Sequence, residues 1–147
     1  MAILRRLGAD EALLAAMLLL TRTVNEQDRL SEARAIWEDA VSLAERTEHP
    51  RYAAMSLVQL ANSLYREGAF EAAEEFWRRA LDHYKSLGDL SYQAEVKLSL
   101  GYVAYRLGRP DDSLELAAES RQLSERAGRS DLRASTDELV SRLAAAN

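Results

Sequence analysis

The sequence predicts an all-α protein built as a solenoid of antiparallel helix pairs. In one stretch, apolar residues recur at spacings of three and four, which places them on one stripe of a helix: Phe70, Ala73, Phe76, Trp77, Ala80 and Leu81. The pattern also occurs forty residues earlier, at Leu30, Ala33, Ile36, Trp37, Ala40 and Val41, and in weaker form forty residues later. A unit repeated in this way buries its apolar stripe only by stacking on its neighbours.

The forty-residue period divides one domain, residues 1–147, into consecutive parts. We expect an N-terminal stub over 1–9, repeats over 10–49, 50–89 and 90–129, and a capping helix over 130–147. The stub is interpreted either as the end of a helix from a longer array or as a short helix of its own. The expected architecture is therefore about three helix pairs followed by one terminal helix.

The first pair is expected over residues 10–25 and 30–46. Asp10 is the expected N-cap, since its carboxylate accepts from the free N–H groups of a first turn. From position 12 to position 20 the helix is apolar nearly all round, as in helices that are buried on more than one side. These nine residues are too few to span a membrane, which needs about twenty.

Two explanations of this apolar helix are open. The stub could fold back and cover it, or it could form a self-association surface, because exposed apolar patches usually mark interfaces. We hypothesise a homodimer with two-fold symmetry. The residues assigned to the contact are Ile3, Leu4, Leu7, Leu13, Leu14, Met17 and Leu18, with Leu19 and Leu20 beside them.

The second pair is expected over residues 50–66 and 70–87. Pro50 suits the first position of a helix, where its missing N–H would be unpaired in any case. Gly68 and Gly88 follow the two helices as stop signals.

The third pair is expected from residue 91 to 107, before Gly108, and again from Pro110. Its second helix has small residues where the second repeat carries Ala73, Trp77 and Ala80: these are Ser113, Ala117 and Ser120. The missing tryptophan leaves space that must be filled, because interiors tolerate few voids. We expect the last helix, over 131–146, to supply the filling.

Composition excludes several classes of partner and site. The net charge is −5 and both signs are mixed along the chain, so there is no basic stripe to neutralise phosphates, and we expect no nucleic acid partner. There is no cysteine, which removes disulfides and thiolate chemistry and fits a cytoplasmic location.

The residues that usually carry enzyme chemistry are not grouped in the sequence. His49 and His83 have no second ligand at helical spacing, and no nucleophile turn or glycine-rich phosphate loop occurs. Trp37 and Trp77 keep helical spacing to small residues, which predicts core packing and not a cofactor site. We expect a non-enzymatic protein without cofactor or metal.

The pattern resembles the tetratricopeptide repeat (TPR) family. In the second repeat the residues that carry the resemblance are Leu60, Ala61, Leu64, Gly68, Phe70, Ala73, Trp77, Ala80 and Leu81; in the third they are Leu100, Gly101 and Gly108; and in the first they are Leu20, Val24, Leu30, Ala33, Trp37 and Ala40. The forty-residue period is longer than the family's usual repeat of about 34. The resemblance implies a right-handed superhelix whose concave wall, formed by the first helix of each pair, holds a peptide or helix of a partner protein.

Carried over position by position, the resemblance implies a groove lined by Arg22, Asn25, Gln59, Asn62, Tyr65, Arg66, Tyr102, Tyr105 and Arg106. Asn62 matches an asparagine that grips peptide backbone in related proteins. The lysines and second asparagine of the carboxylate-gripping version are absent, which counts against recognition of a C-terminal carboxylate.

Alternatives remain open for several of these residues. The tyrosines could contact a ligand or pack against adjacent helices, and Arg66 and Arg106 could form a basic rim or satisfy the carbonyls at their own helix ends. The alternative function is a self-associating structural element, or a fragment of a longer TPR sensor or scaffold, with no peptide ligand.

Overall fold

A computed structural model describes residues 2–26 and 29–145, and within them the chain forms seven helices and no strand. The helices are α1 (Ala2–Glu26), α2 (Leu30–Arg46), α3 (Pro50–Arg66), α4 (Phe70–Ser86), α5 (Leu90–Arg106), α6 (Pro110–Ala127) and α7 (Ser130–Ala145). None of these helices is long and apolar enough to cross a membrane. The all-α solenoid expected from the sequence is confirmed.

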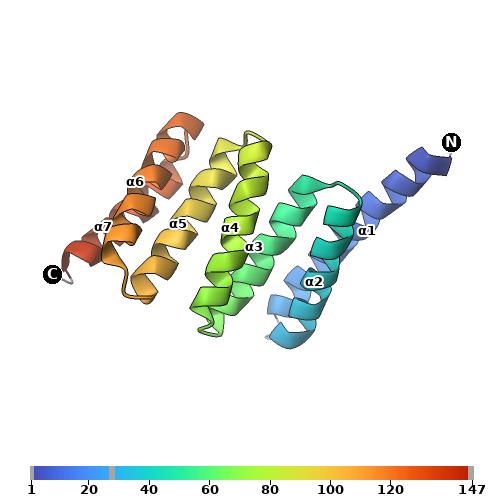
Figure 1. Cartoon of the computed structure of the whole chain (residues 1–147), viewed down its shortest axis with the longest axis horizontal. Coiled ribbons are helices and arrows are strands. Elements are labelled where there is room, and N and C mark those ends of the chain that lie inside the picture. The colour runs from blue at the N-terminus through green and yellow to red at the C-terminus, as the bar shows by residue number, and fades with distance from the viewer. Residues whose placement is uncertain (1, 27–28, 146–147) are drawn as a thin grey trace.

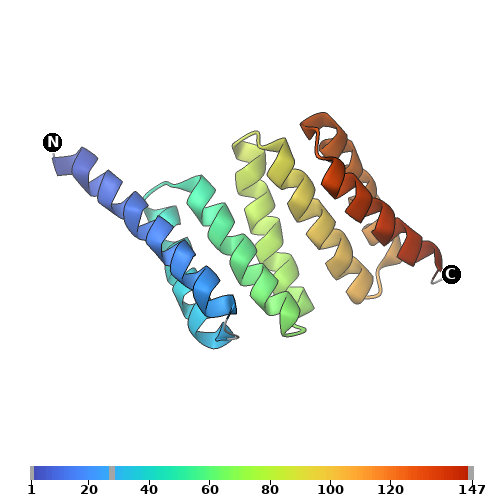
Figure 2. The same ribbon diagram turned by 180° about the vertical axis from the view of Figure 1, so that it is seen from behind.

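The helices stand in two layers. In Figure 1 the helices α2, α4 and α6 lie in front, and we call them the B layer. Figure 2 shows α1, α3, α5 and α7 side by side on the opposite side, and we call them the A layer. Contacts run mainly between helices that follow one another in the chain, with additional contacts between α1 and α3 and between α5 and α7. This is the stacking that a repeated helix pair requires.

The first helix differs from the expectation. The predicted stub and the helix expected from Asp10 form one helix that begins at Ala2 and continues through Gly8. Glycine lowers helix propensity by only about 1 kcal/mol relative to alanine, and the good helix formers around it outweigh that cost. The N-terminal turns of α1 project past α2 (Figures 1 and 2).

The turns repeat every twenty residues with the same backbone. Gly68, Gly88, Gly108 and Gly128 all have positive φ, and Glu48 occupies the same place in the series with φ 58°. At the turn after α3, the Ala69 N–H donates to the Leu64 carbonyl at 2.9 Å and the Gly68 N–H to the Tyr65 carbonyl at 3.1 Å. This pair of bonds is the Schellman motif, which satisfies the last free carbonyls of a helix.

The core is built from the stripes that the sequence indicates. Trp37 and Trp77 are both buried, which confirms the core assignment. Their indole N–H groups lack a hydrogen-bond acceptor within the described residues. Because the feature occurs in both repeats, we attribute it to the packing of the repeat.

The third repeat closes the space that its missing tryptophan leaves. The buried Ser113 and Ser120 hydroxyls donate to the Gly101 and Ala94 carbonyls of α5 at 2.7 and 2.8 Å, which holds α6 close to α5. From α7, Leu132, Leu139 and Leu143 pack with Ala117 in one buried cluster. The last helix therefore fills the core as expected.

Candidate binding groove

A hollow of about 320 Å³ lies between α3 and α5, with α4 beneath it. The lining residues of α3 and α5 occupy matching helical spacings, whereas those of α4 are buried side chains that form the floor. We call this hollow the groove; it is lined by Met55, Val58, Gln59 and Asn62 of α3, Trp77 and Tyr84 of α4, and Tyr92, Glu95, Val96 and Ser99 of α5. Its two walls are both helices of the A layer.

Two of the predicted groove residues, Gln59 and Asn62, lie in this lining. They are three residues apart on α3 and therefore on one face, and both are half-buried. Neither side-chain amide has a hydrogen-bond partner among the described residues. Each amide has both donors and an acceptor, so the pair offers hydrogen bonds to a peptide backbone.

Two stacked tyrosines lie at one side of the groove. The rings of Tyr84 and Tyr92 are parallel to within 12°, with their centroids 5.0 Å apart. Tyr84 is buried, and this burial raises the pKa of its hydroxyl well above the ordinary value. Tyr92 is exposed, so the stack joins the core to the surface.

An ion pair bounds the groove at the N-terminal ends of α3 and α5. Arg51, one turn before Met55, donates from Nη1 to Asp89 Oδ2 at 3.0 Å. Asp89 is the N-cap of α5 and accepts from the Tyr92 N–H at 3.1 Å. Partial burial alone would raise the pKa of Asp89, but the hydrogen bonds from Tyr92 and Arg51 outweigh it and hold that pKa below its ordinary value.

Tyr65 and Arg106 bound the groove at the opposite ends of the same helices. Arg106 Nε donates to the Tyr65 hydroxyl at 3.4 Å, and the guanidinium lies 5.9 Å from the centre of the Phe70 ring. The Tyr65 ring centroid is 5.2 Å from that of Phe70 and 5.8 Å from that of Trp77. Both predicted residues therefore make intramolecular contacts, and Tyr65 is part of the packing between α3 and α4.

The remaining predicted groove residues lie elsewhere. Tyr102 and Tyr105 are half-buried and pack against the cluster shared by α5, α6 and α7. Burial, and then the nearby Glu138 carboxylate, raise the pKa of Tyr102. Arg22 and Arg66 are exposed, and each has an interaction within the chain. The side chain of Asn25 lies outside the described residues.

The residues assigned to self-association also differ in where they lie. Leu14 is fully buried with Ala40, Ala44 and Ala53, so it belongs to the core and is not available as a surface contact. Met17 and Leu18 are half-buried, whereas Leu13 is exposed. The side chains of Ile3, Leu4 and Leu7 lie outside the described residues.

Sequence reasoning missed all four residues of the α5 wall. Tyr92, Glu95, Val96 and Ser99 follow the spacing of the α3 wall, at intervals of three and four. The forty-residue register was the available signal, because it aligns Ser99 with Gln59 and Glu95 with Met55. Tyr84 belongs to a second helix, and the resemblance pointed only to first helices.

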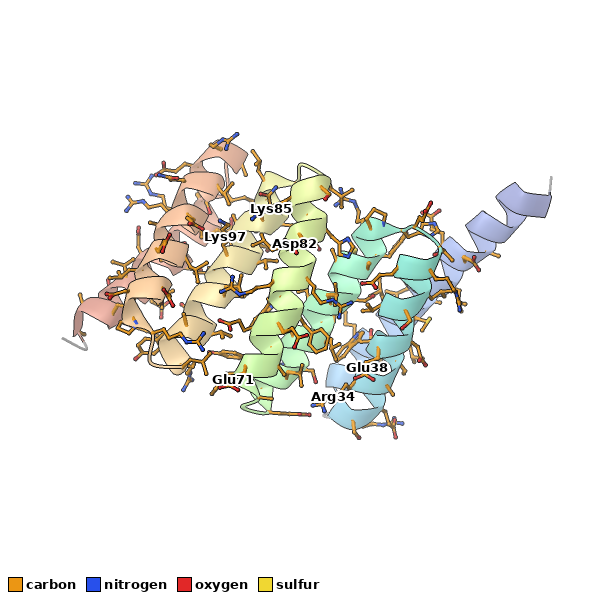
Figure 3. All side chains as sticks on the ribbon, in the orientation of Figure 1. Arg34, Glu38, Glu71, Asp82, Lys85 and Lys97 are labelled. Atoms are coloured by element: carbon orange, nitrogen blue, oxygen red, sulfur yellow. The ribbon has the colours of Figure 1, made fainter. Side chains whose placement is uncertain are left out.

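Charged side chains cover the B layer. Figure 3 shows Arg34 and Glu38 on α2 and Asp82 and Lys85 on α4. Several pairs link successive repeats: Arg34 with Glu67, Arg79 with Glu45, and Arg109 with Glu74. Within the described residues no three His, Cys, Asp or Glu side chains are grouped so that they could hold a metal ion. The charges of these three pairs are neutralised within the chain.

The fold and the groove together define a helical-repeat domain in which a hollow lies between two parallel helices of the same layer. The family model for the tetratricopeptide repeat matches residues 52–126, just over half of the chain, and the chain belongs to this family. The family resemblance seen in the sequence is thereby confirmed. Comparison with curated protein sequences finds no match.

Solved structures share the fold. Aspartyl phosphate phosphatase F from Bacillus subtilis matches with a TM-score of 0.87 and 19% identity, over 91% of this chain and 35% of that chain. The apo form of RapI matches with a TM-score of 0.83 and 10% identity, over 93% and 54% of the two chains. The TPR domain of Arabidopsis FLU matches with a TM-score of 0.73 and 18% identity, over 79% and 98%. The chain thus spans about a third of the phosphatase and about half of RapI, and the likeness concerns the fold.

Proposed function

We propose that the chain is a non-enzymatic interaction domain whose groove holds a peptide or helix of a partner protein. The observation that carries this proposal is the pair of half-buried, unpartnered amides of Gln59 and Asn62 at the groove. The amide atoms of both residues are open to solvent, so a bound peptide backbone can replace water as their hydrogen-bond partner.

The remaining lining of the groove fits an apolar anchor. Met55, Val58 and Val96 supply apolar walls beside the ring of Trp77. The volume of about 320 Å³ is near the lower end of the range for small-molecule sites. We infer that it receives one or two side chains of the partner, while Gln59 and Asn62 bond the backbone beside them.

The family supports the same proposal. TPR superhelices commonly hold partner peptides on the face formed by first helices, and α3 and α5 are the first helices of their pairs. The proposed function takes only this general role from the family.

The experiment starts from a library of random twelve-residue peptides displayed on phage and selected on the full chain. Selected peptides are synthesised, and their affinities are measured by isothermal titration. We expect Gln59→Ala with Asn62→Ala to weaken binding by about tenfold, because two lost hydrogen bonds are worth about 1.4 kcal/mol or more. Gln122→Ala is the matched control, since Gln122 is exposed on α6 in the opposite layer.

Nuclear magnetic resonance locates the bound peptide. We expect the amide signals of α3 and α5 to shift on titration and those of α6 to stay in place. Equal affinity in the double variant and the control, or shifts confined to the B layer, would overturn the proposal. Thermal denaturation of each variant confirms that the fold is kept.

A further inference from the structure

One side of α1 is apolar and open to solvent. Leu13, Leu19 and Leu20 are 50%, 67% and 52% exposed. They lie within an arc of about 120° around the helix, counted at 3.6 residues per turn. We call this arc the α1 face; it consists of Ala9, Ala12, Leu13, Ala16, Leu19, Leu20 and Thr23, all exposed. No charged residue among the described side chains of α1 falls within it.

The forty-residue register shows what this face is built to contact. In α3 the positions equivalent to Leu13, Ala16, Leu20 and Thr23 are Ala53, Ser56, Leu60 and Ser63, and all four are buried. In α5 the equivalents Gln93, Val96, Leu100 and Val103 are buried too. Helices α3 and α5 each follow another helix pair, whereas α1 packs on α2 and α3. These positions therefore face the preceding pair, and the α1 face continues the surface that joins one repeat to the next.

We propose that a second copy of this chain covers the α1 face, with the two α1 helices antiparallel about a two-fold axis near residue 18. The α1 face alternates large and small residues as Leu13, Ala16, Leu20 and Thr23. Antiparallel pairing about residue 18 sets Leu13 against the second copy's Thr23 and Ala16 against its Leu20. In this row of four residues, both leucines, Leu13 and Leu20, then meet a small side chain, which is the self-complementarity that a two-fold contact requires.

Thr23 does not interrupt the apolar contact. Its hydroxyl donates to the Leu19 carbonyl within the same helix at 3.2 Å, so the methyl group is left for the second copy. A parallel arrangement in register would instead place leucine on leucine and leave the small residues facing voids. The α1 face extends about 21 Å along the helix from Ala9 to Thr23.

The first test is the mass of the full chain by sedimentation velocity from about 1 to about 100 µM. We expect a monomer–dimer equilibrium that Ala16→Glu with Leu20→Glu weakens by at least about tenfold, because two charges would be buried against apolar side chains. Leu114→Glu with Ala118→Glu is the matched control, since these residues are also a leucine and an alanine four apart on an exposed helix surface. A wild-type monomer throughout, or equal loss of dimer in the control, would overturn the proposal.

The second test concerns how the two α1 helices are aligned against each other. The chain has no cysteine, so Leu13→Cys and Thr23→Cys chains can be mixed and oxidised. We expect rapid cross-linking in the mixture and slow cross-linking of either variant alone, because like positions would be about 15 Å apart along the helices. Faster cross-linking of either variant with itself would overturn the antiparallel arrangement. All the substituted positions are exposed in the single chain, so the fold does not depend on them.

Discussion

Arg51 and Asp89 are 38 residues apart in the chain and are joined at 3.0 Å, between Nη1 and Oδ2. The same carboxylate accepts from the Tyr92 N–H and so begins α5. One side chain therefore caps a helix and fixes that helix to the first helix of the preceding repeat. The link joins the two walls of the groove at their N-terminal ends.

We expect Asp89→Ala to lower the free energy of unfolding by about 1 kcal/mol through loss of the cap. Asp89→Asn keeps a capping oxygen but loses the ion pair, and should lower it less. The pKa of Asp89 is lower in the folded chain, so its contribution is complete above the unfolded pKa of about 4 and is lost as the pH falls through the folded value. Urea denaturation should therefore show that the difference in free energy of unfolding between wild type and Asp89→Asn shrinks from pH 7 to pH 3. A difference that stays constant would contradict this account.

We expect Glu48→Gly to raise the free energy of unfolding by about 0.5–1 kcal/mol. Glu48 has φ 58° at a turn where the other repeats have glycine, and a side chain with Cβ is strained there. The reciprocal variant, Gly88→Ala, should be destabilised by about 1 kcal/mol, since an added Cβ would meet no neighbour and only the backbone strain would count. Thermal and urea denaturation measure both, and a destabilised Glu48→Gly would show that the turn needs the glutamate.

Gly101 lies where α7 approaches α5 closely. A Cβ added there would lie 3.0 Å from Leu139 Cδ2, the end of a fully buried side chain. We expect Gly101→Ala to change the free energy of unfolding by less than about 1 kcal/mol, because gained helix propensity offsets the tight contact. Gly101→Val should be destabilising by about 2 kcal/mol, and Leu139→Ala should recover part of that loss in a double-mutant cycle. Additive effects would contradict the close approach.

Substitutions at Tyr65 test whether this predicted groove residue packs within the chain or binds a ligand. Tyr65→Phe removes the hydroxyl that accepts from Arg106 and keeps the ring against Phe70 and Trp77. We expect stability to change by less than about 0.5 kcal/mol and the affinity for selected peptides to stay within about twofold. Tyr65→Ala should be destabilising by about 3 kcal/mol. A large loss of affinity in Tyr65→Phe would assign the hydroxyl to the ligand.

The sequence predicted the helix ends where backbone chemistry is decisive. Pro50 and Pro110 begin α3 and α6, and Gly68 and Gly108 follow α3 and α5 with positive φ. The boundary predicted between the stub and the helix from Asp10 was wrong, because a glycine is a stop only where the chain must turn, and α1 continues through Gly8. Periodicity alone does not distinguish these two cases.

The groove was only partly predictable. Gln59 and Asn62 could be placed from the family resemblance, which points to first helices, whereas Tyr84 reaches the lining from beneath, out of a second helix. Leu14 was assigned to a surface because its neighbours are apolar on all sides, and only the packing of α2 and α3 shows that it is core. Which face of an apolar helix is covered depends on its neighbours in space.

The recurrence of one turn geometry at twenty-residue intervals makes the molecule extensible. The joints on either side of the second repeat have the same backbone, so residues 50–89 could be duplicated in a gene without altering either junction. The longer product would carry a second copy of the α3 wall at the pitch of the solenoid. The length of a bound segment that the surface contacts would then show how much of it each repeat binds.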